Sequence, residues 1–138
     1  LGASGIAEGM ASLGLEKSLN HARERKINGQ PLGSYQAIQF MLSEMSCELE
    51  AARALLYKTA SEVQIKPGIA PLAAYNLKFL ATETTLRILD KALQIHGGQG
   101  YTKEFILERL YRDARGLTLH WGPTEQIKET LGKALLAF

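Results

Sequence analysis

The sequence has few of the residues that build disulfide-stabilised, metal-clustered or membrane-spanning proteins. Its 138 residues include a single cysteine, Cys47, and four prolines. A lone cysteine excludes an internal disulfide and any multi-cysteine metal site, and the neighbours Met45 and Leu49 predict a core or interface thiol. No apolar run approaches the ~20 residues of a transmembrane helix, and no signal-peptide pattern opens the chain. We expect no membrane span and a reducing compartment, either the cytoplasm or, in a eukaryote, the mitochondrial matrix.

Neither sign of charge dominates the chain. The 16 basic and 14 acidic residues leave a net charge of +2, and the two signs are interleaved, as in Arg23-Glu24-Arg25-Lys26. Such mixing is typical of a solvated helix face rather than of a nucleic-acid-binding stripe. Aromatic residues make up 7% of the chain and form no base-stacking series. We therefore expect no nucleic-acid partner.

Motifs of several catalytic classes are also missing. His21, His96 and His120 each lack a Glu three residues earlier, which excludes the Glu-x-x-His pairs of a di-iron bundle, and we expect no metal. The Gly97-Gly98-Gln99-Gly100 turn follows a helical pattern and lacks the full G-x-G-x-x-G, so it is not a Rossmann fingerprint. No P-loop, zincin or nucleophile-elbow pattern occurs. The chain by itself contains no complete catalytic constellation.

Helical periodicity is what the sequence does contain, and no alternating strand pattern is convincing. Small residues recur along the first segment and would let a second helix approach closely: Ala3, Ala7, Ala11, Gly14, Ser18 and Ala22. The Asn28-Gly29 turn signal, with Pro31 after it, ends that segment. Ser34 is a candidate N-cap for a second helix, whose apolar positions keep three-four spacing: Ile38, Met41, Leu42, Met45, Leu49, Ala52, Leu55, Leu56 and Val63.

Further breaks divide the second half of the chain. Pro67-Gly68 and Pro71 precede a third helix with a stripe of Leu72, Tyr75, Phe79, Thr82, Leu86, Leu89 and Leu93, which stops at the glycine turn. A shorter fourth helix is expected over 104–115. Gly116 and Gly122-Pro123 then frame a loop, and a last helix points Ile127, Leu131, Leu135 and Phe138 inward. Long helices with short connections predict an all-α, up-down four-helix bundle with an additional short helix.

Four segments, in this order, resemble the carboxy-terminal helical domain of the acyl-CoA dehydrogenase family. They are the run 23–32, the run 36–53, the glycine turn 94–101, and the charged run 109–115 with the loop after it. The resemblance covers essentially the whole chain. It implies one helical-bundle domain over 1–138 that is a fragment of a longer flavoprotein, and the lack of an initiator Met at Leu1 leads to the same expectation. The fragment alone is expected to be inactive.

The resemblance also implies a function. The full-length protein would be an FAD-dependent enzyme of fatty acid metabolism that oxidises acyl-CoA to 2,3-enoyl-CoA and reduces an electron-transfer-flavoprotein-like acceptor. It would be a homo-oligomer, a dimer or a homotetramer, with the FAD shared between subunits. The resemblance assigns the cofactor contacts to Arg25 at the pyrophosphate, Gln36 beside it, Gln94, Gly97 and Gly98 along the adenine-pyrophosphate stretch, and Thr124 and Gln126 at the flavin.

Several candidate positions also have a purely structural interpretation. Arg25 would complement the dipole at a helix end, and the glycine turn would be a helix C-cap. His96 is expected to pack rather than to act as a ligand or a base. Arg112 and Asp113 are expected to form a structural ion pair or a cap.

Trp121 departs from the family at the place where its catalytic base is expected. Counted from Asp113, Trp121 occupies the position of the loop Glu that removes the proton alpha to the thioester carbonyl, and an indole cannot accept that proton. Three alternatives remain open. The base lies just before Leu1, on the first helix; or Glu125 supplies the carboxylate; or the protein is a non-catalytic subunit or an oxygen-using relative. The catalytic residue therefore stays unassigned.

Overall fold

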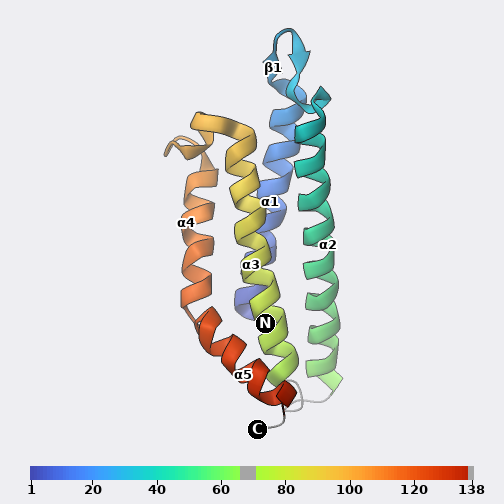
Figure 1. Ribbon diagram of the computed structural model, residues 1–138, viewed down its shortest axis with the longest axis vertical. Helices are drawn as coiled ribbons and strands as arrows, with labels where there is room; N and C mark the ends of the chain where they lie inside the picture. Colours follow the sequence, from blue (N-terminus) through green and yellow to red (C-terminus); the bar gives the residue numbers. More distant parts are fainter. Residues whose placement is uncertain (66–70, 137–138) are drawn as a thin grey trace.

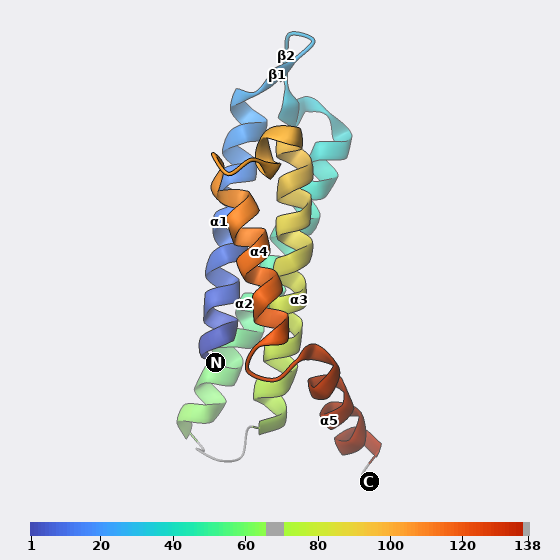
Figure 2. The same ribbon diagram turned by 90° about the vertical axis from the view of Figure 1, so that its left-hand side faces the viewer.

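A computed structural model of the chain describes residues 1–65 and 71–136, and these residues form five α-helices. The helices α1 (Gly2–Glu24), α2 (Gln36–Ile65), α3 (Pro71–His96) and α4 (Ile106–Leu119) run alternately up and down (Figure 1). The shorter α5 (Thr124–Leu136) turns away from the bundle axis below α4 (Figure 2). This arrangement confirms the predicted up-down four-helix bundle with an additional short helix. No helix in the described ranges is both long and apolar enough to cross a bilayer.

A small hairpin joins α1 to α2. Strand β1 (Lys26–Ile27) pairs antiparallel with β2 (Gln30–Pro31), and the two residues between them, Asn28 and Gly29, have φ of 51° and 81°. Positive φ at both central residues is the geometry that two-residue hairpin loops favour, and it suits an Asn-Gly pair. The sequence therefore located the turn, but the expectation of no strand is wrong here. Two-residue strands are too short to show an alternating pattern.

Ser34 is not the N-cap of α2. A 3₁₀ segment, η1 (Leu32–Ser34), precedes the helix, and the Ser34 hydroxyl donates to the Pro31 carbonyl at 2.7 Å. Helix α2 then begins at Gln36. The hydroxyl stabilises the turn before the helix instead of satisfying a first-turn amide, which is the usual competition between local Ser hydrogen bonds and capping.

The small-residue stripe of α1 faces α3, as predicted. Ala7, Ala11 and Gly14 are buried, and a Cβ atom built on Gly14 would lie 2.7 Å from Cδ2 of Leu89. The Thr85 hydroxyl of α3 donates across the contact to the Ala7 carbonyl at 2.9 Å. A Cβ atom at position 14 would force the Leu89 side chain to shift, and a large side chain on this face of α1 would push the two helices apart.

Helix α3 is the central element and contacts each of the other four helices. Its most buried apolar residues are Leu77, Ala81, Ile88, Leu89, Ala92 and Ile95. The single stripe predicted for this helix is wrong at its start, because Leu72 and Tyr75 are 45% and 38% exposed. A helix with neighbours on several sides buries more than one face, so a search for one stripe misplaces its core positions.

Helix α2 packs through its inner face and carries ion pairs to its neighbours. Met45 and Leu49 lie in the core. Arg53 pairs with Glu8 of α1 at 2.7 Å, and Arg87 of α3 pairs with Glu48 at 2.9 Å. The outer face of α2 carries exposed large apolar side chains, Phe40, Tyr57 and Ile65, together with exposed Cys47. Of the predicted core or interface thiol, the core alternative is therefore wrong, and the interface alternative stays a prediction.

Helix α4 is longer at its carboxy end than predicted. It begins at Ile106 and ends at Leu119, so Gly116 is part of the helix rather than the edge of a loop. Its surface ion pairs join residues four apart: Arg112 to Glu108 at 3.3 Å and Arg109 to Asp113 at 3.4 Å. The predicted Arg112–Asp113 pair is wrong, because neighbouring residues of a helix point in different directions.

Helix α5 is anchored mainly at its first turns. Ile127 is buried and Leu131 half-buried, as predicted, but Leu135 is 86% exposed. The last turn of the helix is exposed at Leu135 and Leu136, so it lies at the surface of the described structure. The positions Phe138 and Pro67-Gly68 lie outside the described residues.

Candidate functional site

The candidate residues form two clusters near opposite ends of the bundle (Figure 1). We call Arg25, Gln36, Gln94, Gly97 and Gly98 the hairpin-end cluster, and Trp121, Thr124, Glu125 and Gln126 the loop-end cluster. Lys78 is hydrogen-bonded to the loop of the second cluster, and it lies 18 residues before His96, the last residue of α3. With 1.5 Å of rise per residue, that stretch of helix separates the clusters by about 27 Å. The structure therefore brings the predicted positions together in two groups, not in one.

In the hairpin-end cluster, the glycine turn forms an open wall. The turn is the 3₁₀ segment η2 (Gly97–Tyr101), in which Gly97 has φ of 61°. A Cβ atom built on Gly97 or Gly98 would meet no other atom within 4 Å. Together with Gln94, these glycines line a hollow of about 650 Å³ that Asp90, Leu93, Tyr101 and Tyr111 complete. A ligand in this hollow would meet bare peptide groups on one side.

Arg25 and Gln36 lie at the same end of the bundle but do not line this hollow. Arg25 is the C-cap of α1: its N–H donates to the His21 carbonyl at 2.9 Å, and its own carbonyl accepts from Leu32 N–H at 2.7 Å. These bonds fix the backbone while the guanidinium stays exposed. Gln36 opens α2 and is also exposed.

His96 packs behind the glycine turn, as predicted. Its Nδ1 donates to the Ala92 carbonyl at 2.8 Å, and its ring stacks on His21 of α1 with 4.2 Å between the centroids. A Cβ atom on Gly100 would lie 2.8 Å from the His96 Cβ, so the turn is pressed against this residue. Burial lowers the pKa of His96, with the Ala92 hydrogen bond opposing it, and burial followed by repulsion from His96 lowers the pKa of His21.

The stacked histidines predict an acid-sensitive stability. Both pKa values are lowered from the ordinary 6.5, so the unfolded chain binds more protons once the pH falls through 6.5, and the free energy of unfolding decreases down to the folded pKa values. Urea unfolding between pH 8 and 5.5 should show this loss. The double variant His21→Asn, His96→Asn should lose less free energy of unfolding over this pH range than the wild type. The control variant His120→Asn should lose as much as the wild type. Equal pH dependence in all three would contradict the prediction.

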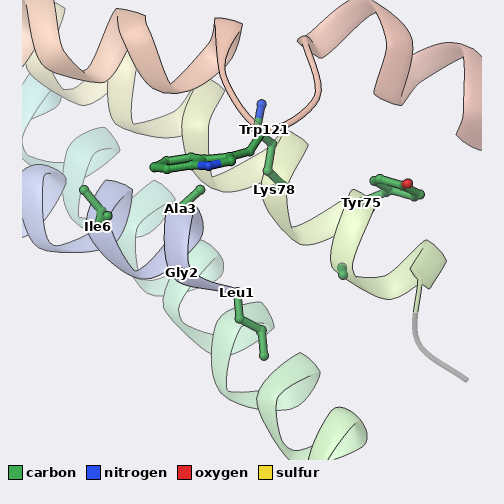
Figure 3. A pocket seen from close by; sticks show the side chains of 8 residues that line it. Leu1, Gly2, Ala3, Ile6, Tyr75, Lys78 and Trp121 are labelled. Carbon is green, nitrogen blue, oxygen red and sulfur yellow. The ribbon is translucent and has the colours of Figure 1, made fainter. Parts of the chain in front are cut away.

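At the loop end, an apolar cavity of about 440 Å³ lies between the start of α1 and α3. Its described lining is Leu1, Gly2, Ala3, Ile6, Ala74, Tyr75, Lys78 and Trp121. Figure 3 shows the Trp121 indole lying flat above Ala3 and Ile6, with Tyr75 further along α3. Among these lining residues there is no carboxylate, so the described part of the cavity offers no general base of that type.

The loop between α4 and α5 is held by a buried lysine. Lys78 is 6% exposed, and its Nζ donates to the Gly122 carbonyl at 2.7 Å. Burial lowers the pKa of Lys78, while Glu83 and Glu125 act in the opposite direction. Trp121, next to the bonded carbonyl, is 70% exposed and has φ of 52°, and Gly122 has φ of 94°.

Thr124, Glu125 and Gln126 form the first turn of α5. Thr124 is buried, and its hydroxyl donates to Glu83 Oε1 at 3.0 Å. Glu125 and Gln126 are exposed, and Glu125 is absent from the described lining of the cavity beside Trp121. The hydroxyl of Thr124 is thus committed to the protein interior.

Sequence reasoning missed Lys78, Tyr75 as a cavity residue, and the stack of His21 on His96. Lys78 lies within an apolar helical pattern, where a lysine ordinarily extends to solvent, and its partner is a backbone carbonyl 44 positions away. His21 and His96 are 75 positions apart and meet only because α1 and α3 pack together. No local pattern carries either signal. In the described residues, no group of three or more histidine, cysteine or acidic side chains could hold a metal ion.

Comparison with known proteins gives consistent matches. The profile of the family described as "Acyl-CoA dehydrogenase, C-terminal domain" matches residues 1–136. The caffeyl-CoA reductase–Etf complex subunit CarC of Acetobacterium woodii is 40% identical over 136 residues, which is 99% of this chain and 35% of that protein. The probable acyl-CoA dehydrogenase YngJ of Bacillus subtilis is 40% identical over 95% of this chain and 34% of its own length.

The butyryl-CoA dehydrogenase structure from Megasphaera elsdenii superposes with a TM-score of 0.89 at 33% identity, covering 98% of this chain and 36% of that one. The chain thus spans about a third of the length of the relatives that it matches.

Proposed function

Because this chain belongs to the acyl-CoA dehydrogenase family, as its carboxy-terminal helical domain, we propose that it serves within a longer flavoprotein that oxidises acyl-CoA to 2,3-enoyl-CoA. The observation that carries the proposal is the open glycine wall of the hairpin-end cluster, with an exposed arginine at the same end of the bundle. The domain boundary at 1–138 and the inactivity of the domain alone are parts of the same proposal.

The hairpin-end cluster suits the phosphate and adenine part of FAD. The Arg25 guanidinium carries a fixed fork of donors that matches phosphate oxygens, and it extends from a backbone held at both ends. Gln36 and Gln94 offer an amide donor and acceptor. Gly97 and Gly98 allow peptide groups to approach a ligand without an intervening side chain. When bound, FAD would supply the acceptor for the hydride of the substrate.

The loop-end cluster would contact a different FAD molecule. The two clusters lie about 27 Å apart along α3, and each copy of the chain would contribute one end to its own FAD and the other end to that of a partner. Gln126 would use its exposed side chain. Thr124 would use backbone, because its hydroxyl donates to Glu83 and first-turn N–H groups lack intrahelical partners.

A homo-oligomer, a dimer or a tetramer, follows from this sharing. The electron acceptor would be a flavoprotein of the electron-transfer type, since the relative CarC is named as a subunit of an Etf complex. A reducing compartment, the cytoplasm or the mitochondrial matrix, fits these partners.

The catalytic base is proposed to lie outside the described cavity lining. Trp121 cannot accept a proton, and Glu125 is exposed on α5 and is not among the described lining residues of the cavity. A carboxylate from elsewhere in the full-length protein, placed beside the start of α1, would be desolvated by Leu1, Ala3 and Ile6, which raises the pKa of a carboxyl and suits it to general-base catalysis.

Anaerobic bleaching of the flavin in the full-length protein by a panel of acyl-CoA thioesters tests the proposal. We expect loss of the oxidised flavin absorbance with at least one thioester, and no turnover from the 138-residue domain alone. Bound flavin that no thioester reduces would favour the second candidate, a non-catalytic subunit or an oxygen-using relative. Trp121 at the base position is the observation behind that alternative. Mixing the chemically reduced flavoprotein with oxygen would separate the non-catalytic subunit from the oxygen-using relative.

A further inference from the structure

We propose that Trp121 is a specificity-determining residue whose indole face receives a flat, aromatic acyl group, and that Lys78 is the positioning residue that keeps the indole in place. This inference rests on the proposed function, because it names the acyl class that the enzyme would take. It is carried by the backbone of Trp121, the buried contact of Lys78 and the apolar cavity between them.

The backbone of Trp121 is strained. Its φ of 52° lies in the left-handed region, which bulky residues rarely occupy because the side chain crowds the following carbonyl group. Strain of this kind persists only where the surroundings impose it, and it is concentrated at ligand sites. The strain turns an indole that is 70% exposed onto the mouth of the cavity.

Lys78 imposes this conformation. Burying an ammonium group is unfavourable unless it is hydrogen-bonded, and the Lys78 Nζ bonds to Gly122, the residue directly after Trp121. Figure 3 shows the Lys78 side chain rising from α3 towards the loop, so its stem lines the cavity while its charged end holds the loop. The negative charges of Glu83 and Glu125 lie near enough to support that cation.

The cavity selects for flat, uncharged groups. Its described walls are Leu1, Ala3, Ile6, Ala74, Tyr75 and the Lys78 stem, with the indole as the flat surface. An aromatic ring can stack flat on the indole in an offset arrangement, in which the quadrupole interaction of the two rings is favourable. A puckered ring with the same number of carbon atoms touches the plane through fewer atoms and gains less dispersion energy.

The test compares 3-phenylpropanoyl-CoA with 3-cyclohexylpropanoyl-CoA, which match in carbon count and differ in flatness. In the full-length protein, we take the ratio of kcat/KM for the phenyl thioester to that for the cyclohexyl thioester. Comparing this ratio between variants cancels the intrinsic reactivity of the two compounds. We expect Trp121→Leu to lower it about three- to tenfold, and Trp121→Phe to retain most of it.

Lys78→Met should lower the same ratio, because the stem stays while the bond to Gly122 is lost. Lys78→Arg keeps a cation at this position and should lose less, which also covers the case in which Lys78→Met fails to fold. A role in folding alone would change both thioesters equally and leave the ratio unmoved. Tyr57→Leu, which removes an aromatic side chain that is 69% exposed on α2, is the matched control and should keep the wild-type ratio.

An unchanged ratio in Trp121→Leu, with both thioesters still turned over, would overturn the inference and leave the proposed function standing. Trp121 would then be covered by another part of the protein. An unchanged ratio in folded Lys78→Met would remove the role of Lys78. Failure of both thioesters, and of the wider thioester panel, to reduce the flavin of the wild type would contradict the proposed function, and the inference would fall with it.

Discussion

Leu89→Ala should lower the free energy of unfolding of the chain by about 2–5 kcal/mol. Leu89 has no exposed surface, and it lies on α3 against the Gly14 face of α1. Helices packed on several sides of α3 limit how far the core can collapse around the lost methyl groups, so a cavity remains and adds to the lost transfer free energy. Urea unfolding followed by circular dichroism measures the change, with an unchanged slope indicating that two-state behaviour holds.

Two further variants make this prediction specific. Leu135→Ala is the matched control, because Leu135 is 86% exposed and its truncation should change stability by less than about 0.5 kcal/mol. Gly14→Ala places a Cβ atom 2.7 Å from Leu89 Cδ2, so overpacking of about 1–3 kcal/mol outweighs the helix-propensity gain of about 0.5–1 kcal/mol. In the Leu89→Ala background the clash is gone, and Gly14→Ala should stabilise. Additive effects in this double-mutant cycle would contradict the proposed contact.

The helical elements and their order were predictable from the sequence, because each depends on local spacing. The small-residue face of α1 also predicted its close contact, since the small side chains of Ala7 and Ala11 and the lack of one at Gly14 let α3 approach. The predictions that failed concern burial, which depends on how many other helices pack against a position. Leu135 keeps helical spacing on α5 but is 86% exposed, whereas α3 packs against four helices and buries faces that a single stripe does not reveal.

The site residues divide in the same way. The glycine turn and the arginine before the hairpin each belong to a continuous stretch of sequence, so a family resemblance can identify them. Lys78 is not part of any motif. Its role depends on a bond to the carbonyl of Gly122 and on a loop conformation that places Trp121 at positive φ. Trp121 was noticed for the carboxylate it replaces, and its function as the wall of a cavity became visible only when α1 and α3 were placed on either side of it.

Arg25→Met should weaken FAD binding about 10- to 100-fold. The substitution keeps an unbranched side chain and removes the guanidinium, and hydrogen bonds to charged groups contribute about 1.5–3 kcal/mol, which corresponds to that range in the dissociation constant. The backbone bonds of Arg25 to His21 and Leu32 do not involve the side chain, so the fold should persist. Titration of the deflavinated full-length protein with FAD, followed by quenching of flavin fluorescence, gives the constants.

Arg23→Met separates a phosphate contact from a general effect of positive charge. Arg23 lies one turn or less from Arg25, in the last turn of α1, and is exposed, so its removal changes the net charge and the helix-end electrostatics by the same amount. If Arg25 were only a solvated cation at the helix end, it would act through the helix dipole and be screened by salt. Both variants would then lose the same amount of FAD affinity, and that loss would be small at high ionic strength. If the Arg25 guanidinium instead binds the pyrophosphate, the dissociation constant of Arg23→Met for FAD should stay within about twofold of the wild type. The loss of affinity in Arg25→Met should then persist at high ionic strength, because salt screens a desolvated ion pair far less than an exposed one.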